Sequence, residues 1–155
     1  MIRMVIVVLV TVFAAPAWAT TYFVSKTGNN ANSCATAQGS GASAKLTITN
    51  ALANCIQSGD TLTVQAGTYQ ESLSELLGVT IASGGGTDLT RTVLQCEGDR
   101  TCAITPTNIT HWSFVLWQAN TSWITIKNFV LGRGIHLGSS TRPSVDYPHH
   151  IKVEN

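Results

Sequence analysis

The segments WITIKNF (123–129) and HHIKVEN (149–155) repeat one pattern of alternating apolar and polar residues. Aligning Ile124 with Ile151 gives an offset of about 27 residues, a spacing typical of proteins built from stacked repeats. Equivalent side chains of adjacent repeats stack on one another, so we expect the two segments to pair as parallel strands. The same alignment pairs Ile126 with Val153, Lys127 with Glu154 as an opposite-charge pair, and Asn128 with Asn155 as the start of an amide ladder.

Other short runs of β type are spread along the chain, each bounded by Gly, Asn, Pro or Ser. In one of them Leu62 and Val64 alternate with threonines, which predicts a strand with one buried face. No Asn-Gly or Asp-Gly turn separates two matched runs, which argues against a sandwich of hairpins. Short strands that meet at corners such as Asn128 favour a coiled stack instead. The remaining predicted strands are YFVS (22–25), GVTIAS (78–83), RTVLQCE (91–97) and SFVLWQ (113–118).

The segment LTITNALANCIQSGD (46–60) changes to a helical period, with its apolar residues largely on one face. We expect one short amphipathic helix here. Thr47 and Thr49 are the candidates for capping its start, and Gly59 is expected to end it.

Residues 1–19 have the pattern of a signal peptide. Arg3 precedes an apolar run of about a dozen residues, and Ala17-Trp18-Ala19 fits the small-x-small cleavage pattern. An uncleaved membrane anchor is the alternative, but the apolar run is shorter than the ~20 residues that a span needs. We therefore expect cleavage after Ala19 and a secreted, extracellular or periplasmic protein without a membrane segment.

The composition excludes some classes of partner. The whole sequence has nine basic and eight acidic side chains, and one of the basic ones lies in the leader. The remaining charges balance, so bulk charge gives no attraction to nucleic acid. Abundant Thr, Ser, Asn and Gly indicate a β-rich fold with many turns.

The four cysteines form an even set in a chain that we expect to be exported, which predicts disulfides. Three pairings exist, and we favour Cys34 with Cys55 and Cys96 with Cys102 because each closes a local loop. A zinc site is the alternative, although the chain has no CxxC spacing.

The stretches YFVSKTGNN (22–30) and SGDTLTVQAGTYQES (58–72), with the helix between them, resemble the N-terminal region of the right-handed parallel β-helix proteins, the pectate-lyase-like superfamily. Gly67-Thr68-Tyr69 is the most distinctive triplet. The resemblance implies an all-β right-handed solenoid with a short N-terminal capping α-helix, in which residues 20–155 form the cap and the first coils. A small disulfide-stapled β domain of unrelated fold is the alternative.

The sequence stops on a strand-like segment without a cap, so we expect it to be the N-terminal portion of a longer protein. A complete small domain that dimerises through its open end is the alternative. Either interpretation allows self-association through the last coil, because uncovered strand edges pair readily.

The resemblance also implies a function on polysaccharides, with an acidic polymer as the expected partner and a lyase more expected than a glycoside hydrolase. Lyases of this superfamily use Lys or Arg as base and often calcium, but no calcium site is visible here. No catalytic motif of the family maps onto this sequence, so the catalytic residues stay unknown and this portion is expected to be inactive alone. The alternative function is a non-catalytic surface, adhesion or glycan-binding β-helix protein.

Candidates for a substrate groove come from a polar region late in the chain. Arg133, His136 and Arg142 lie in or beside a long loop, where guanidinium groups would pair with sugar carboxylates. A solvated loop is the alternative. His149 and His150 open a strand, so we expect their side chains to point to opposite faces.

Three tryptophans provide a second idea about sugar binding. Exposed indole rings would stack on sugar rings, whereas packing beneath loops is the alternative that we favour for Trp117 and Trp123 because they flank strands. Trp112 is the third tryptophan considered for stacking on a sugar ring.

Overall fold

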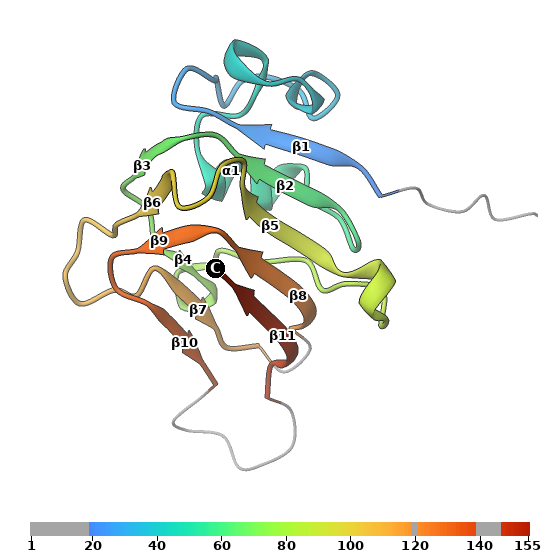
Figure 1. The fold of residues 1–155 in the computed structure, drawn as a ribbon, viewed down its shortest axis with the longest axis vertical. Coiled ribbons are helices and arrows are strands. Elements are labelled where there is room, and N and C mark those ends of the chain that lie inside the picture. Colours follow the sequence, from blue (N-terminus) through green and yellow to red (C-terminus); the bar gives the residue numbers. More distant parts are fainter. Residues whose placement is uncertain (1–18, 119–120, 139–146) are drawn as a thin grey trace, which may run out of the picture.

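The computed structural model describes residues 19–118, 121–138 and 147–155 (Figure 1). The predicted signal peptide falls almost entirely outside these residues. The described chain is mostly β-structure with one α-helix. The strands are β1 (Thr21–Val24), β2 (Thr61–Val64), β3 (Gly67–Tyr69), β4 (Leu73–Ser74), β5 (Thr92–Cys96), β6 (Cys102–Ile104), β7 (Phe114–Leu116), β8 (Ser122–Lys127), β9 (Phe129–Leu131), β10 (Ile135–Leu137) and β11 (His149–Glu154). The helical elements are α1 (Ile48–Asn54) and the 3-10 turns η1 (Thr36–Gln38), η2 (Gly41–Ser43), η3 (Glu75–Leu77) and η4 (Asp88–Thr90).

The described strands form three sheets, in which neighbouring strands pair in parallel. Their orders are β1-β2-β5-β8-β11, β3-β6-β9 and β10-β7-β4. From β2 onward the chain visits the three sheets in rotation, so each pass adds one strand to each sheet (Figure 1). The predictions of a mostly-β class and of parallel pairing between successive passes are confirmed.

The register of β8 and β11 is the one predicted from the repeated pattern. Ile124 pairs with Ile151, Ile126 with Val153, and Lys127 with Glu154. The nearest ion-pair partner of Glu154, however, is Lys152 of its own strand, at 2.6 Å. The proposed amide ladder between Asn128 and Asn155 stays a prediction.

Apolar side chains of successive passes form columns inside the three sheets. Leu62 of β2 pairs with Leu94 of β5, which pairs with Ile126 of β8, and all three are at most 1% exposed. Full burial of one such side chain stabilises the fold by about 1.5–3 kcal/mol. The columns therefore favour one register, because a slip by one residue would turn each column toward solvent.

The corner expected at Asn128 is present. Its φ of 64° is left-handed, a conformation that Asn tolerates better than most residues. Its N–H donates to the carbonyl of Glu154 at 2.9 Å, so the corner is tied to the next pass of the chain.

The α-helix begins where the sequence predicted and ends earlier. Thr47 caps it by accepting a hydrogen bond from the N–H of Asn50, and Ile48 is buried on its inner side. The prediction that Gly59 ends the helix is wrong: α1 ends at Asn54, and Gly59 has a φ of 85° in the turn before β2. After the helix Ile56 lies in the core, where it is 5% exposed.

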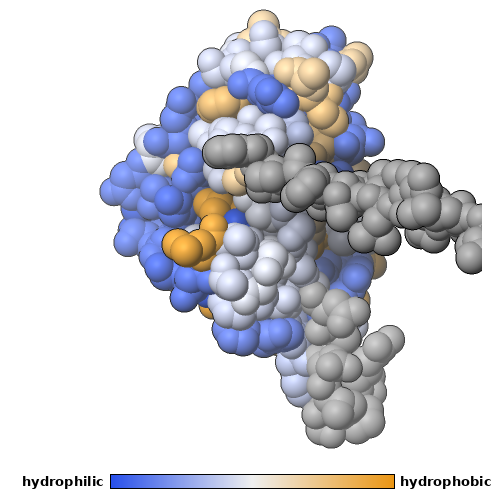
Figure 2. All heavy atoms as spheres, turned by 90° about the vertical axis from the view of Figure 1, so that its right-hand side faces the viewer, coloured by the Kyte–Doolittle hydropathy of each residue, from blue (hydrophilic) through white to orange (hydrophobic). Residues whose placement is uncertain are grey.

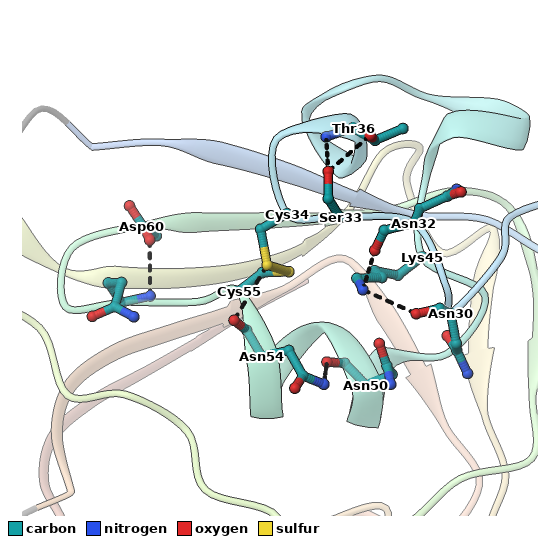
Figure 3. Close-up of a disulfide and its surroundings, with 11 residues drawn as sticks. Asn30, Asn32, Ser33, Cys34, Thr36, Lys45, Asn50, Asn54, Cys55 and Asp60 are labelled. Carbon is teal, nitrogen blue, oxygen red and sulfur yellow. Dashed lines mark hydrogen bonds between the residues drawn. A yellow bond between two sulfur atoms is a disulfide. The ribbon is translucent and has the colours of Figure 1, made fainter.

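Residues 25–45 cover the outer edge of β1. Lys45 forms a bridge with Val24, and its buried Nζ donates to the carbonyls of Asn30 (3.1 Å) and Asn32 (Figure 3). Burial of this amine is offset by these hydrogen bonds to carbonyl oxygens. The loop is thereby fixed over the first strand of the large sheet.

Both predicted disulfides are present. Cys34 bonds to Cys55 and joins this covering loop to the end of α1, and Cys96 bonds to Cys102 across the corner between β5 and β6. All four cysteines are therefore bonded, and the alternative of a cysteine zinc site is wrong.

One predicted strand is absent. GVTIAS (78–83) forms no strand, although Val79 and Ile81 are buried at 7% and 2% exposure. The run lies between β4 and β5, where Gly84 and Ser122 make a single backbone hydrogen bond of 3.0 Å in place of a ladder. Alternating burial without pairing gives the same sequence pattern as a strand, which explains the error.

Figure 2 shows the side that lies to the right in Figure 1, where apolar atoms form small separate patches among hydrophilic and neutral ones. The buried apolar residues form one core cluster, which includes Leu62, Leu94 and Ile126.

Tyr69 generates a prediction about pH. Burial, and secondarily the nearby Glu71 carboxylate, raise the pKa of its phenol to about 12, and its hydroxyl donates to the carbonyl of Gln65 at 2.9 Å. The folded state holds this proton above the ordinary pKa of ~10, so stability is lost as pH rises from about 10 toward 12, by up to ~1.4 kcal/mol per pH unit. Urea unfolding between pH 8 and pH 11 should show this slope in the free energy of unfolding. Tyr69→Phe should remove the part of the slope that is due to the Tyr69 phenol. An equal alkaline slope in both proteins would contradict the assignment.

Candidate functional site

The outer surface of the sheet β4-β7-β10 carries one row of residues in register. Val115 of β7 pairs with Ser74 of β4 on one side and with His136 of β10 on the other. Phe114 and Leu116 are fully buried in the core, so alternation along β7 turns Val115 to the other face of the sheet, together with Ser74 and His136, which pair with it. On that face Val115 and Ser74 are covered, at 3% exposure each, whereas His136 is partly exposed. The row places an imidazole ring on the outside of the sheet.

Two tryptophans flank that imidazole ring. Trp112 precedes β7 and Trp117 follows it, and their rings lie 5.6 Å and 5.9 Å from the ring of His136. Trp117 stacks on His136 with an interplanar angle of 28°, whereas Trp112 is tilted by 42°. We call Trp112, His136 and Trp117 the aromatic face. Trp112 is 46% exposed, so much of its ring surface is available to a ligand.

A pocket of about 190 Å³ adjoins the aromatic face and shares Trp112 with it. Leu76 and Leu77 of η3 contribute exposed side chains, at 57% and 52% exposure, on the surface of this pocket. Its lining combines these apolar groups with hydroxyl groups. The lining residues are Ser72, Ser74, Leu76, Leu77, Thr110, His111, Trp112 and Val115.

Trp112 lies between residues of the two neighbouring passes of the chain, Ser72 and Gly134. The Ser72 hydroxyl donates to the Trp112 carbonyl at 2.7 Å. Gly134 has a φ of 70°, and a Cβ added there would lie 3.8 Å from the indole ring. Glycine suits the left-handed backbone at this position, while a Cβ would only be in ordinary van der Waals contact with the indole ring.

Trp117 is held by a buried carboxylate that the sequence did not reveal as part of the site. Glu75 is 8% exposed and accepts hydrogen bonds from the N–H groups of Trp117 and Gln118 (2.6 Å) and from the hydroxyl of Thr121 (2.5 Å). Three donors offset the cost of burying this group. Glu75 therefore fixes the chain direction directly after β7 and with it the position of Trp117.

The residues predicted for a groove are only partly brought together. His136 is central to the aromatic face. Arg133 is exposed and directly precedes Gly134, and its N–H donates to the Ser113 hydroxyl at 3.2 Å. Arg142 lies outside the described residues.

Trp123 belongs to a different cluster, at the start of β8. Its ring stacks on that of His150 at 4.0 Å and 9°, and the Arg91 guanidinium lies 5.3 Å from the ring centre. Both Trp123 and His150 have a φ of 55°, so the same irregularity recurs in two successive passes of the chain. These contacts are consistent with the packing role favoured for Trp123 from the sequence.

The expectation that His149 and His150 point to opposite faces is wrong. Both are exposed, and their rings contact each other at 5.0 Å. The positive φ of His150 interrupts the alternation of the strand, which is the physical reason for the error.

Other acidic side chains also have structural roles. Asp60 accepts hydrogen bonds from the N–H groups of Thr20 and Gln57, as expected of a turn-forming residue. Glu71 accepts from the first N–H groups of α1, at Ile48 and Thr49. These carboxylates stabilise turns and the helix start by compensating unpaired backbone donors.

Across residues 19–118, 121–138 and 147–155, no three His, Cys, Asp or Glu side chains gather closely enough to hold a metal ion. Within the same ranges, no helix has the length and apolar character needed to cross a membrane.

Comparisons with known proteins give no match. No protein-family model, no curated protein and no solved structure matches this chain. Functional inference therefore depends on the geometry of the aromatic face and on the sequence resemblance.

The role of Glu75 generates a prediction. Glu75→Gln replaces one acceptor oxygen by an N–H donor and removes the charge, so the hydrogen bonds to Trp117, Gln118 and Thr121 weaken. We expect a loss of about 2–3 kcal/mol in the free energy of unfolding and a reduced tryptophan signal in near-ultraviolet circular dichroism. Glu97→Gln is the matched control, because Glu97 is exposed and its carboxylate accepts a hydrogen bond from the side-chain amide of Gln65 at 2.9 Å. Equal stability and spectra for the two variants would contradict the role of Glu75.

Proposed function

We propose that this chain is an exported right-handed parallel β-helix protein that binds polysaccharide through the aromatic face. The fold part of the proposal is supported by the rotation of the chain through three parallel sheets and by the constant register of its passes. The sequence resemblance to the pectate-lyase-like superfamily points the same way. Export is supported by the leader pattern and by the two disulfides.

The binding part of the proposal rests on one observation, the pair of tryptophans on either side of His136. Sugar rings present C–H groups on their faces and hydroxyl groups at their edges. An indole ring offers a flat apolar surface to the C–H groups, and nearby polar groups form hydrogen bonds with the hydroxyl groups. The half-exposed Trp112, the ring of His136 and the hydroxyl groups of Ser72 and Thr110, which line the adjoining pocket, provide both kinds of contact.

An acidic polymer is the class of polysaccharide that the charges favour. Arg133 is exposed and directly precedes Gly134, where an added Cβ would lie 3.8 Å from the ring of Trp112. A guanidinium group pairs with carboxylates through two parallel hydrogen bonds, which suits a uronate unit next to a stacked sugar.

Binding is favoured over catalysis for this part of the chain. The buried carboxylate nearest the aromatic face, Glu75, is already bonded to three donors. General acid–base catalysis needs a group that is free to exchange a proton with the substrate. A polysaccharide lyase is the second candidate function. It is favoured by the exposed Arg133, which would act as the base.

The test is affinity for a panel of acidic and neutral polysaccharides, measured by isothermal titration calorimetry. Trp112→Ala should weaken binding to the preferred polymer by about tenfold or more, as expected when a central aromatic contact is removed. Leu89→Ala is the control, because Leu89 is 98% exposed on η4 and lies outside the lining of the pocket.

Each outcome has a defined meaning. No binding to any polymer, or equal affinity of Trp112→Ala and the original protein, would contradict the proposal. Release of unsaturated products from a uronate polymer, lost in Arg133→Ala, would establish the lyase instead.

A further inference from the structure

The pocket that adjoins the aromatic face shares Trp112 with it and has a volume of about 190 Å³. Sites that enclose a whole small ligand typically measure ~300–1,000 Å³. This pocket is therefore suited to a substituent of a larger ligand rather than to a complete sugar unit. A sugar ring stacked on Trp112 projects its substituents from its edge, so one of them can enter the adjoining pocket.

One wall of the pocket consists of leucine side chains that are open to solvent. Leu76 and Leu77 belong to η3 and are 57% and 52% exposed. Val115 and the indole ring of Trp112 extend this apolar lining. A ligand methyl group placed here removes hydrocarbon surface from water, which favours binding. A sugar hydroxyl group gains nothing from the same contact.

The pocket is uncharged. Among the described residues that line it, none is Asp, Glu, Lys or Arg. A carboxylate in the pocket would lose water without gaining a cation as partner, which is unfavourable. The exposed Arg133 lies outside the lining and is the better partner for a uronate carboxylate. The pocket therefore favours a neutral substituent.

The hydrogen-bonding groups of the lining leave one donor for a ligand. The Ser72 hydroxyl donates to the Trp112 carbonyl at 2.7 Å, and the Thr110 hydroxyl donates to Oδ1 of Asn108 at 2.8 Å. The side-chain amide nitrogen of Asn108 lies 3.5 Å from Nε2 of His111. This nitrogen can only donate, so Nε2 of the neutral ring accepts and the imidazole proton is on Nδ1. The Nδ1–H of His111 is the donor that a ligand carbonyl oxygen can use.

A methyl group joined to a carbonyl group matches this lining. We propose that the pocket binds an acetyl group carried by a sugar unit of the polysaccharide, with the methyl group against Leu76 and Leu77 and the carbonyl oxygen accepting from His111. An acetyl group leaves a uronate carboxylate free to pair with Arg133, whereas a methyl ester of that carboxylate would remove its charge. The proposal rests on the polysaccharide-binding function proposed above and adds the form of the polymer that is preferred.

The experiment compares the two forms of one polymer by isothermal titration calorimetry with the whole chain. An O-acetylated uronate polymer should bind about tenfold more tightly than the same polymer after mild alkaline deacetylation, because only the acetylated form covers the leucine wall and bonds to the imidazole. An N-acetylated amino-sugar polymer is compared with its N-deacetylated form in the same way. A preference for the acetylated form in either pair supports the proposal and identifies the acetyl group as ester or amide.

A pair of matched variants separates the pocket from the rest of the surface. Leu76→Asn should lower the affinity for the acetylated polymer to that for the deacetylated one, and should leave the affinity for the deacetylated polymer unchanged. Leu89→Asn is the control, because Leu89 is the second residue of η4 as Leu76 is of η3, and it is 98% exposed outside the pocket lining. Leu89→Asn should keep the full acetyl preference. Unchanged circular dichroism in both variants verifies the fold.

The outcomes that would overturn this proposal differ from those that bear on polysaccharide binding itself. Equal affinity for the acetylated and deacetylated forms of both polymers, or an acetyl preference that Leu76→Asn retains, would overturn the acetyl site and leave polysaccharide binding in place. A preference for a methyl-esterified uronate polymer without one for the acetylated polymer would overturn it as well. Absence of binding to every polymer would overturn the proposed function and the acetyl site together.

Discussion

The structure depends on the parallel pairing of each pass of the chain with the pass before it. Backbone hydrogen bonds set the spacing of the passes, and the apolar columns such as Leu62, Leu94 and Ile126 set their register. Each column is buried only because the neighbouring passes are present, so no single strand is stable alone. The strands are short, and their stability comes from this mutual coverage rather than from length.

The corners between strands need a different kind of interaction. Their backbone groups lack ladder partners, and several acidic side chains supply the missing acceptors. Glu71 does so at the start of α1, and Glu75 does so directly after β7. Because Trp117 follows β7, the carboxylate that stabilises a corner also positions one side of the candidate binding surface.

Much of the fold was predictable from the sequence, because burial imposes a period on the residues. The strands around Leu62 and Ile124, the cap at Thr47 and both disulfides follow from local patterns. The three-residue strands β3, β6 and β10 and the two-residue β4 are too short to show a period. GVTIAS shows the period without the pairing, and the positive φ of His150 is a tertiary effect that alternation cannot predict. The aromatic face was only partly predictable, since Trp112, His136 and Trp117 are joined by sheet register.

The most direct test of this account is a measurement of methyl–methyl nuclear Overhauser effects in the folded protein. Stacked parallel passes predict strong effects linking Leu62 to Leu94 and Leu94 to Ile126, because these side chains pair in register across β2, β5 and β8. Absence of both effects in a well-folded sample, or cross-strand contacts that require antiparallel neighbours in this sheet, would contradict it.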